Sequence, residues 1–258
     1  MRVTVLASGS KGNAMLVEAD AHTRLLVDAG LDPDTLLKQL AAAGYDARPT
    51  AIVLTHAHGD HSRFANLIAG RWRLPVYVTE ATKKMVRLDA APTVRVFGKS
   101  DGFRLGELEV GALPIPHDAP QVSLRFSHAG RSAVIATDLG EVEPALVRHC
   151  AGADVVLIES NHDVDMLWHG PYTHFLKRRV ASGHGHLSNV QTAAFLRRLP
   201  REVRTVVLMH LSEVNNRPEI ALHVAAEALG DHAAQLVAAR QWGVTRTETV
   251  TPRQLSLF

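Results

Sequence analysis

Cysteine and membrane-spanning apolar runs are what this sequence lacks most clearly. Only Cys150 stands among 258 residues, which excludes an internal disulfide and suits a reducing compartment. The amino end, MRVTVLASGS, alternates like a strand and has no signal-peptide core, and no later run reaches transmembrane length without a charge. We therefore expect a cytoplasmic protein with no membrane segment.

Aromatic residues are also few, at 5%, but the hydrophobic share of 46% is enough for one sizeable core. No linker rich in proline, glycine or serine and no internal repeat divides the chain. We expect a single domain over residues 1–258. What the chain has in surplus is histidine, with 15 residues.

The net charge of +2 is a weak argument for a polyanionic partner, but the local charge says more. Residues 171–204 contain one acid, Glu202, and seven basic residues: Lys177, Arg178, Arg179, Arg197, Arg198, Arg201 and Arg204. If this segment faces the active site, its basic side chains are candidates to contact the phosphates of a nucleic acid.

Short β-rich runs alternate with helical patterns along the chain. The stretch LDPDTLLKQLAAAG predicts a helix that begins at Asp32 and Pro33 and stops at Gly44. Apolar runs of strand length predict strands at residues 2–7, 13–19, 23–29, 51–55, 75–79, 108–115, 122–127, 132–137, 154–160, 205–210 and 234–239. Two β-rich halves with helices outside predict an α/β fold, a four-layer αββα sandwich.

The stretch AIVLTHAHGDHSRF, residues 51–64, ends an apolar run on four ionisable side chains. On an extended loop, His56 and His58 would point the same way. Asp60 and His61 would lie on the turn entering a helix that begins near Ser62. The segment can therefore present ligands to two neighbouring points.

Three imidazoles and a carboxylate this close would repel one another when protonated and would lose hydration when buried. A divalent cation offsets both costs. Imidazole with carboxylate suits zinc, manganese or iron, and the absence of clustered cysteines argues against a structural zinc knuckle.

The same arrangement recurs at His117 in LPIPHD, Asp138 in SAVIATD and His210 in TVVLMH, each just past the carboxyl end of an apolar run. Any one of them alone would be better explained as a satisfied surface or core residue. Together with the first cluster they make seven ligands, which suit two ions about 3.5–4 Å apart, bridged by a carboxylate and a water or hydroxide. Asp138 is the expected bridge.

These motifs, with Asp28 in LLVDAG, resemble the metallo-β-lactamase superfamily over nearly the whole chain. The resemblance implies one metal held by His56, His58 and His117, a second held by Asp60, His61 and His210, and Asp138 between them. It also implies that Asp28 orients the ligand loop. The stretch between Asp138 and His210 is too short for the large inserted domain of the RNA-processing nucleases of this superfamily.

Two departures sort the activities of the superfamily. Asp138 stands where a β-lactamase often has cysteine, and His58 is present where the redox diiron members have an acid, so hydrolysis is favoured and iron is less favoured than zinc or manganese. The segments VLASGSKGNAMLVE, IPHDAP, IATDLG, LIESNHDVDML, GHGHLSN and MHLSEVNNRPE resemble the WalJ/YycJ-like exonuclease subgroup. That resemblance implies a 5′-directed exonuclease on DNA, with RNA as a second substrate to consider.

The segment GHGHLSNVQTA resembles the His-Leu-Ser/Thr motif of related phosphodiesterases, which pair that histidine with a glutamate after an earlier strand. The matching residues are His186 and Glu159. The alternatives are a helix-start residue for His186 and a solvated strand end for Glu159. We expect His186 to protonate the leaving group and His184 to flank the loop.

Two further residues are candidates for substrate contact. Lys11 in SGSKGN could bind a phosphate, although a glycine-rich hairpin turn has the same composition. Asn215 could contact the substrate or cap the helix that includes Pro218.

The mechanism expected from the sequence is in-line attack on phosphorus by a hydroxide that bridges the metals, with Asp60 binding a metal and helping to orient the nucleophile. Two alternatives remain open. A small-molecule hydrolase, such as a lactonase or thioesterase, would use the same ligands without the basic segment or His186. A non-catalytic nucleic-acid adaptor would have lost ligands, and none is missing.

Overall fold

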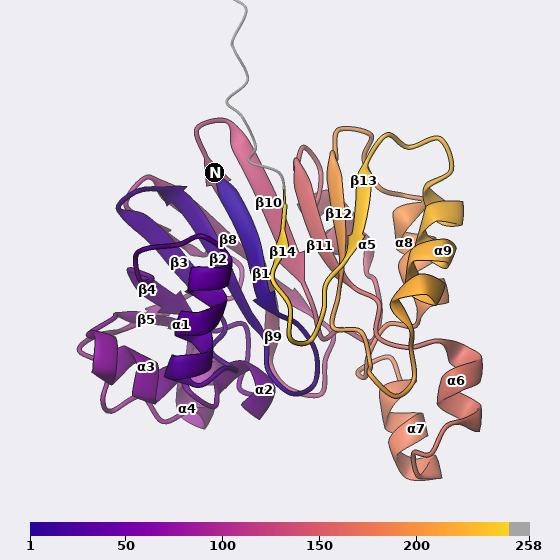
Figure 1. The fold of residues 1–258 in the computed structure, drawn as a ribbon, viewed down its shortest axis with the longest axis horizontal. Coiled ribbons are helices and arrows are strands. Elements are labelled where there is room, and N and C mark those ends of the chain that lie inside the picture. Colours follow the sequence, from indigo (N-terminus) through magenta and orange to yellow (C-terminus); the bar gives the residue numbers. More distant parts are fainter. Residues whose placement is uncertain (248–258) are drawn as a thin grey trace, which may run out of the picture.

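The computed structural model describes residues 1–247, which form two seven-stranded sheets packed face to face with helices outside (Figure 1). The first sheet has the order β14-β1-β2-β3-β4-β5-β6 and the second β13-β12-β11-β10-β9-β8-β7. The strands are β1 (Arg2–Ala7), β2 (Ala14–Asp20), β3 (Thr23–Val27), β4 (Ala51–Val53), β5 (Val76–Thr79), β6 (Val94–Phe97), β7 (Phe103–Leu105), β8 (Leu108–Ile115), β9 (Gln121–His128), β10 (Arg131–Ala136), β11 (Val155–Glu159), β12 (Thr205–Met209), β13 (Gln235–Ala238) and β14 (Thr245–Arg246).

Helices cover both outer faces of the sandwich (Figure 1). They are α1 (Pro33–Ala42), α2 (Gly59–Ser62), α3 (Ala65–Trp72), α4 (Glu80–Met85), α5 (Pro144–His149), α6 (Val164–His169), α7 (His174–Val180), α8 (Asn189–Leu196) and α9 (Pro218–Leu229). Among the described residues, none of these helices combines the length and apolar character needed to cross a membrane. The four-layer αββα arrangement predicted from the sequence is confirmed, and no large insertion interrupts it within residues 1–247.

The central strands are apolar on both faces because each sheet is buried on both sides. In β2, Met15 and Val17 face the other sheet, while Leu16 packs with the helices on the outside. In β12, Val207 faces the other sheet and Leu208 faces the helices. The alternation therefore builds three apolar layers, one between the sheets and one beneath each set of helices.

The helix predicted after residue 30 begins where its sequence signals lie. Asp32 caps α1 by accepting hydrogen bonds from the backbone N–H groups of Asp34 and Thr35, and Pro33 occupies the first turn. Gly44 adopts φ +74° just beyond the helix, a conformation that glycine tolerates without a steric penalty.

Three strands and one helix start differ from the sequence prediction. β6, β7 and β14 were not predicted because they are short edge strands that lack a run of buried apolar residues. The helix expected to begin near Ser62 instead spans Gly59–Ser62, so Asp60 and His61 lie within α2 rather than on the turn before it.

Parallel pairing brings several strand ends to one edge of the molecule. β3, β4, β5 and β6 run parallel in the first sheet, and β10, β11, β12 and β13 run parallel in the second. At this edge the two sheets are tied together, since the His210 backbone N–H donates to the Ser8 hydroxyl at 2.8 Å and the Val122 N–H donates to the Thr55 carbonyl at 3.3 Å.

Candidate metal centre

The candidate ligands lie where parallel strands of both sheets end. Asp28 follows β3, Asp138 lies two residues past β10, and His210 follows β12. All three adopt left-handed backbone conformations, with φ of 62°, 56° and 54°. Such backbone strain costs on the order of 1–3 kcal/mol per residue and concentrates where side chains are aimed at a functional site.

A first cluster consists of His56, His58 and His117, whose ligand atoms lie within 4.8 Å of one another. His58 Nδ1 lies 3.2 Å from His117 Nε2. The outward-facing Nδ1 atoms of the other rings are already bonded, that of His56 to the Thr55 hydroxyl at 3.0 Å and that of His117 to the Gly185 carbonyl at 3.1 Å. Their Nε2 atoms are therefore the ones turned toward a shared point.

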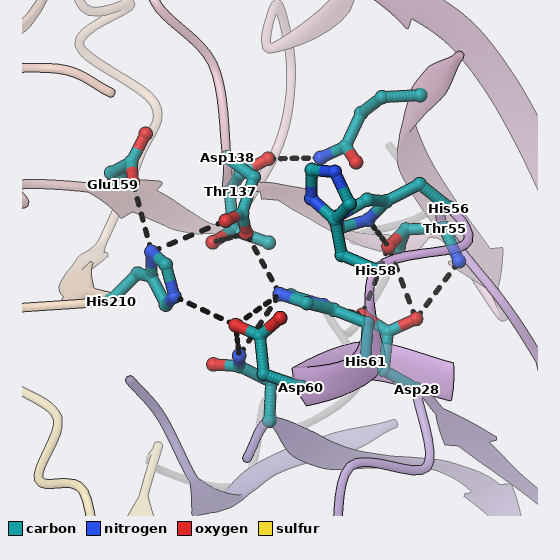
Figure 2. Close-up of polar contacts among 12 residues, drawn as sticks. Asp28, Thr55, His56, His58, Asp60, His61, Thr137, Asp138, Glu159 and His210 are labelled. Atoms are coloured by element: carbon teal, nitrogen blue, oxygen red, sulfur yellow. Dashed lines mark hydrogen bonds and ion pairs between the residues drawn. The ribbon is translucent and has the colours of Figure 1, made fainter. Parts of the chain in front are cut away.

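A second cluster consists of Asp60, His61, Asp138 and His210, again with ligand atoms within 4.8 Å (Figure 2). His61 Nε2 lies 3.0 Å from Asp138 Oδ2, and His210 Nε2 lies 3.4 Å from Asp60 Oδ2. The other oxygen of Asp138 lies 3.3 Å from His210 Nδ1. The carboxylate that was expected to bridge is thus placed with the second cluster.

The donor set of these clusters fits divalent metal ions. His56 Nε2 and His210 Nε2 are buried and make no hydrogen bond within residues 1–247, although buried polar atoms are normally paired. A cation ligated at these nitrogens would satisfy both. Imidazoles and carboxylates without a thiolate suit zinc, manganese or iron rather than calcium or copper(I).

Asp28 is the buried support of both clusters. It is fully buried and its Oδ2 accepts a hydrogen bond from His61 Nδ1 at 2.7 Å. The backbone N–H and hydroxyl of Thr55 donate to Asp28 at 2.9 and 3.0 Å, and the same hydroxyl contacts His56 Nδ1 (Figure 2). One carboxylate therefore fixes the orientation of a ring in each cluster.

The two clusters differ in how their surroundings shift the histidine pKa values. Burial lowers the pKa of His56 and of His117, so both rings favour the neutral form that binds metal. Burial also acts to lower the pKa of His61 and His210, but the neighbouring carboxylates outweigh it, chiefly Asp138. The pKa of His61 is therefore raised, and that of His210 is raised to about 10.

Glu159 and His186 lie next to the second cluster. Glu159 is completely buried at the end of β11, and its Oε1 lies 2.7 Å from His186 Nδ1 and 3.0 Å from His210 Nδ1. Its other oxygen accepts backbone N–H bonds from Leu139 and Leu187 at 2.9 and 3.3 Å. The solvated strand end considered for Glu159 is therefore wrong, because this carboxylate is completely buried.

His186 is only partly covered, with 23% of its side chain exposed, and it lines the cavity over the ligands. Burial acts to lower the pKa of His186, but the Glu159 carboxylate outweighs it and raises the pKa. The ring is therefore held in one orientation beside the cavity and favours its protonated form.

A cavity of about 330 Å³ opens over the ligands and is lined by loops that follow strands of both sheets, by α2 and by α7. It adjoins a larger groove of about 920 Å³ that shares Asp118 with it and includes His117 and His184. His184 therefore borders the neighbouring groove rather than merely flanking the loop.

Asp118 and Asn13 belong to the site and were not predicted. Asp118 Oδ1 lies 3.2 Å from His58 Nε2, and its Oδ2 accepts hydrogen bonds from Arg179 at 2.6 and 2.8 Å. The Asn13 side-chain amide lies 2.9 Å from His61 Nε2. The available signals were the position of Asp118 next to His117 and that of Asn13 at the end of SGSKGN.

The residues predicted to contact the substrate differ in whether they reach the cavity. Arg179 lines the cavity, whereas Lys177 Nζ donates to the Trp168 carbonyl at 2.7 Å. Lys11 is exposed and pairs with Glu213 at 2.6 Å. Asn215 is 1% exposed, and no side chain caps α9, so the capping role considered for Asn215 is wrong.

The basic segment 171–204 is split between two ends of the molecule. Arg204 lies beside Asp154 at the amino ends of β11 and β12, and Arg201 pairs with Asp231 at 3.0 Å. β12 has five residues, so its amino end lies about 17 Å from the end that carries His210. Of the basic side chains of the segment, only those of α7 are therefore near the candidate metal centre.

Comparisons with known proteins agree with this geometry. Residues 23–211 match the β-lactamase superfamily domain. The chain is 34% identical over 238 residues to the exodeoxyribonuclease YycJ of Bacillus anthracis, with 89% of each covered, and 34% identical over 232 residues to the exodeoxyribonuclease WalJ of Streptococcus pneumoniae, with 85% of each covered. The metallo-β-lactamase fold protein YhfI from Bacillus subtilis has the same fold, with a TM-score of 0.71 at 17% identity over 96% of this chain and all of that one. The chain therefore belongs to the β-lactamase superfamily and, within it, to the WalJ/YycJ group.

Proposed function

We propose that this protein is a dinuclear-metal phosphodiesterase that acts as a 5′-directed exonuclease on DNA. The observation that carries the proposal is the pair of ligand clusters beside a buried Glu159–His186 pair. Relatives named exodeoxyribonucleases, at 34% identity over most of the chain, support the substrate class. A nucleic-acid substrate and the single cysteine fit a cytoplasmic enzyme.

In this proposal the first cluster holds one ion and the second cluster holds the other. Asp138 would be the ligand shared by the two ions. Zinc or manganese, when bound, supplies a nucleophilic water at neutral pH and offsets charge on the phosphate. Asp28 and Thr55 keep the ligand rings of His56 and His61 in position.

Two residues of the chain act on the reacting groups in this proposal. Asp60 binds at the second cluster and accepts a hydrogen bond from the attacking water, which orients it toward the phosphorus. His186 donates its proton to the departing sugar oxygen, which is a poor leaving group as an alkoxide. Glu159 stabilises the protonated ring at 2.7 Å and fixes its direction.

The test uses metal-free protein supplied in turn with zinc, manganese and iron(II), and single- and double-stranded DNA and RNA labelled at either end. A 5′-directed exonuclease releases a 5′ label at once as a short product and shortens a 3′-labelled strand progressively. The reverse pattern would overturn the polarity. Hydrolysis of lactones or thioesters without any cleavage of nucleic acid would replace the proposal with the small-molecule hydrolase.

A further inference from the structure

Helices α6 and α7 stand apart from the helices that cover the second sheet (Figure 1, lower right). α7 buries none of its residues, and its Phe175 is 80% exposed. That is the highest exposure of any large hydrophobic side chain in the described part of the chain. Single exposed apolar side chains are common on protein surfaces, so Phe175 points to a ligand only in combination with the charges around it.

The same helix is basic and has no acidic residue. Positions three and four apart on a helix share a face, so Arg178 and Arg179 lie beside Phe175. Arg178 has no acidic partner within residues 1–247, whereas Arg179 is bonded to Asp118. The aromatic ring is therefore flanked by two cations, one of them free to bind an anion.

This surface continues into the cavity over the candidate metal centre. Leu176, Arg179 and Val180 line that cavity together with His186. Arg179 lies between the cavity side of α7 and the side that carries Phe175, because it follows Phe175 by slightly more than one turn and Leu176 by slightly less. A chain molecule bound at Phe175 would thus run past Arg179 to the metal-ligating residues of the cavity.

The charge of the surface decides which partner fits it. A second copy of this chain, paired about a two-fold axis on this face, would bring the cations of α7 against themselves. A polyanion would not meet that repulsion. Proteins that bind single strands combine cations that follow the backbone with aromatic rings on which bases stack.

We propose that α7 is a binding platform for single-stranded DNA, on which a base stacks against Phe175 while Arg178 and Arg179 contact the flanking phosphates. The proposal rests on the proposed nuclease function and adds to it the form of the substrate. Bases inside a duplex are stacked on both faces and cannot offer a face to Phe175, and at a duplex end only the terminal base can. Nucleotides that run along α7 must therefore be single-stranded, and the platform tolerates any base because every base has a π-face.

The experiment measures kcat and KM on a single-stranded oligonucleotide for Phe175→Ala, Phe175→Leu and Phe175→Trp. We expect KM to rise on the order of 10-fold for the alanine variant, the scale of one stacked base. The leucine variant should lose nearly as much, because it keeps an apolar side chain but no π-face. The tryptophan variant should bind as well as the native protein or better.

Two controls separate stacking from other effects. Leu67→Ala removes a side chain that is 54% exposed on α3, away from the cavity, and should leave KM on DNA unchanged. An oligonucleotide series with one abasic position moved along the strand should reproduce the loss in the native protein. At the sensitive position, Phe175→Ala should add no further loss.

Several results would overturn the platform. They are an unchanged KM in Phe175→Ala, full function in Phe175→Leu, or a Phe175→Ala variant that changes the oligomeric state in sedimentation or loses binding to anionic vesicles. If the native protein cleaves DNA in any of these cases, only the platform fails. If the native protein cleaves no nucleic acid, the proposed function fails and the platform fails with it.

Discussion

The two ligand clusters differ in how many carboxylates they contain and lie against. The ligands of the first are imidazoles alone, with a hydroxyl behind His56 and a carbonyl behind His117. The nearest carboxylate, Asp118, lies 3.2 Å from His58 and is itself paired with Arg179. The second contains two carboxylates, and further carboxylates lie behind its rings, Asp28 behind His61 and Glu159 behind His210. An ion in the first cluster would therefore keep more of its charge than one in the second, whose ligands include two carboxylates.

This difference predicts that the second cluster tolerates less change. Asp138→Ala removes the carboxylate that contacts both His61 and His210. We expect at least one of two bound ions to be lost and turnover of every phosphodiester to be abolished. Elemental analysis of the folded, metal-saturated variant measures the loss, with the exposed Asp231→Ala as the matched control.

The same measurement tests the native protein. A native sample that holds one ion or none after saturation would contradict the dinuclear site. Two ions retained in Asp138→Ala would remove Asp138 from the ligands.

The next effect concerns the leaving group, beside the second cluster. His186→Ala should slow cleavage of nucleic acid by about 10²–10⁴, the usual range for general acid catalysis. The leaving group of a nitrophenyl diester is a stabilised phenolate that hardly needs a proton, so cleavage of this diester should slow much less in His186→Ala. His184→Ala removes a histidine two residues away that has no carboxylate partner within residues 1–247, and it should change neither rate much. Equal slowing of both substrates by His186→Ala would show that His186 is not the general acid.

A smaller effect on metal binding is expected from Asp28, which supports the ligand rings from behind. Asp28→Asn keeps the size of the side chain and removes its charge, so the ring of His61 should remain near its position but become a weaker ligand. We expect the affinity for the ion of the second cluster to fall about 10- to 100-fold, and that for the ion of the first, which Asp28 reaches only through Thr55, to fall less. Isothermal titration of metal-free protein resolves the two affinities, and Asp32→Asn, which can still cap α1, is the control. Equal weakening of both ions would show that the clusters do not bind independently.

The sequence predicted best what depends on local patterns. Runs such as that of β12 are apolar on both faces, and the cap at Asp32 marks the start of α1 directly. Edge strands such as β6 were not predicted because their exposed and partly exposed residues leave no run of buried apolar side chains. The seven candidate ligands were found because each follows an apolar run or lies in one dense motif.

Other features of the site depend on long-range contacts that no local pattern encodes. Asp28 was assigned a role by resemblance, and its physical reason is a contact with His61, 33 residues away. Asp118 was overlooked because a single aspartate after a histidine is common on loops. The orientation of the basic segment could not be predicted, since it depends on which ends of β11 and β12 carry its two parts.

The smallest effect concerns that split of the basic segment, because only α7 lies on the side of the two clusters. Cleavage of long single-stranded DNA should weaken steeply with added salt, while cleavage of a small diester should barely change, since only the polymer displaces counterions when it binds. Arg178→Ala should reduce the slope of log(kcat/KM) against log salt by about 0.7, the contribution of one phosphate contact on a single strand. Arg204→Ala removes the same charge at the opposite ends of β11 and β12 and should leave the slope unchanged. Equal changes of the slope in the two variants would mean that DNA binding depends on the overall charge of the protein and that the strand does not run along α7.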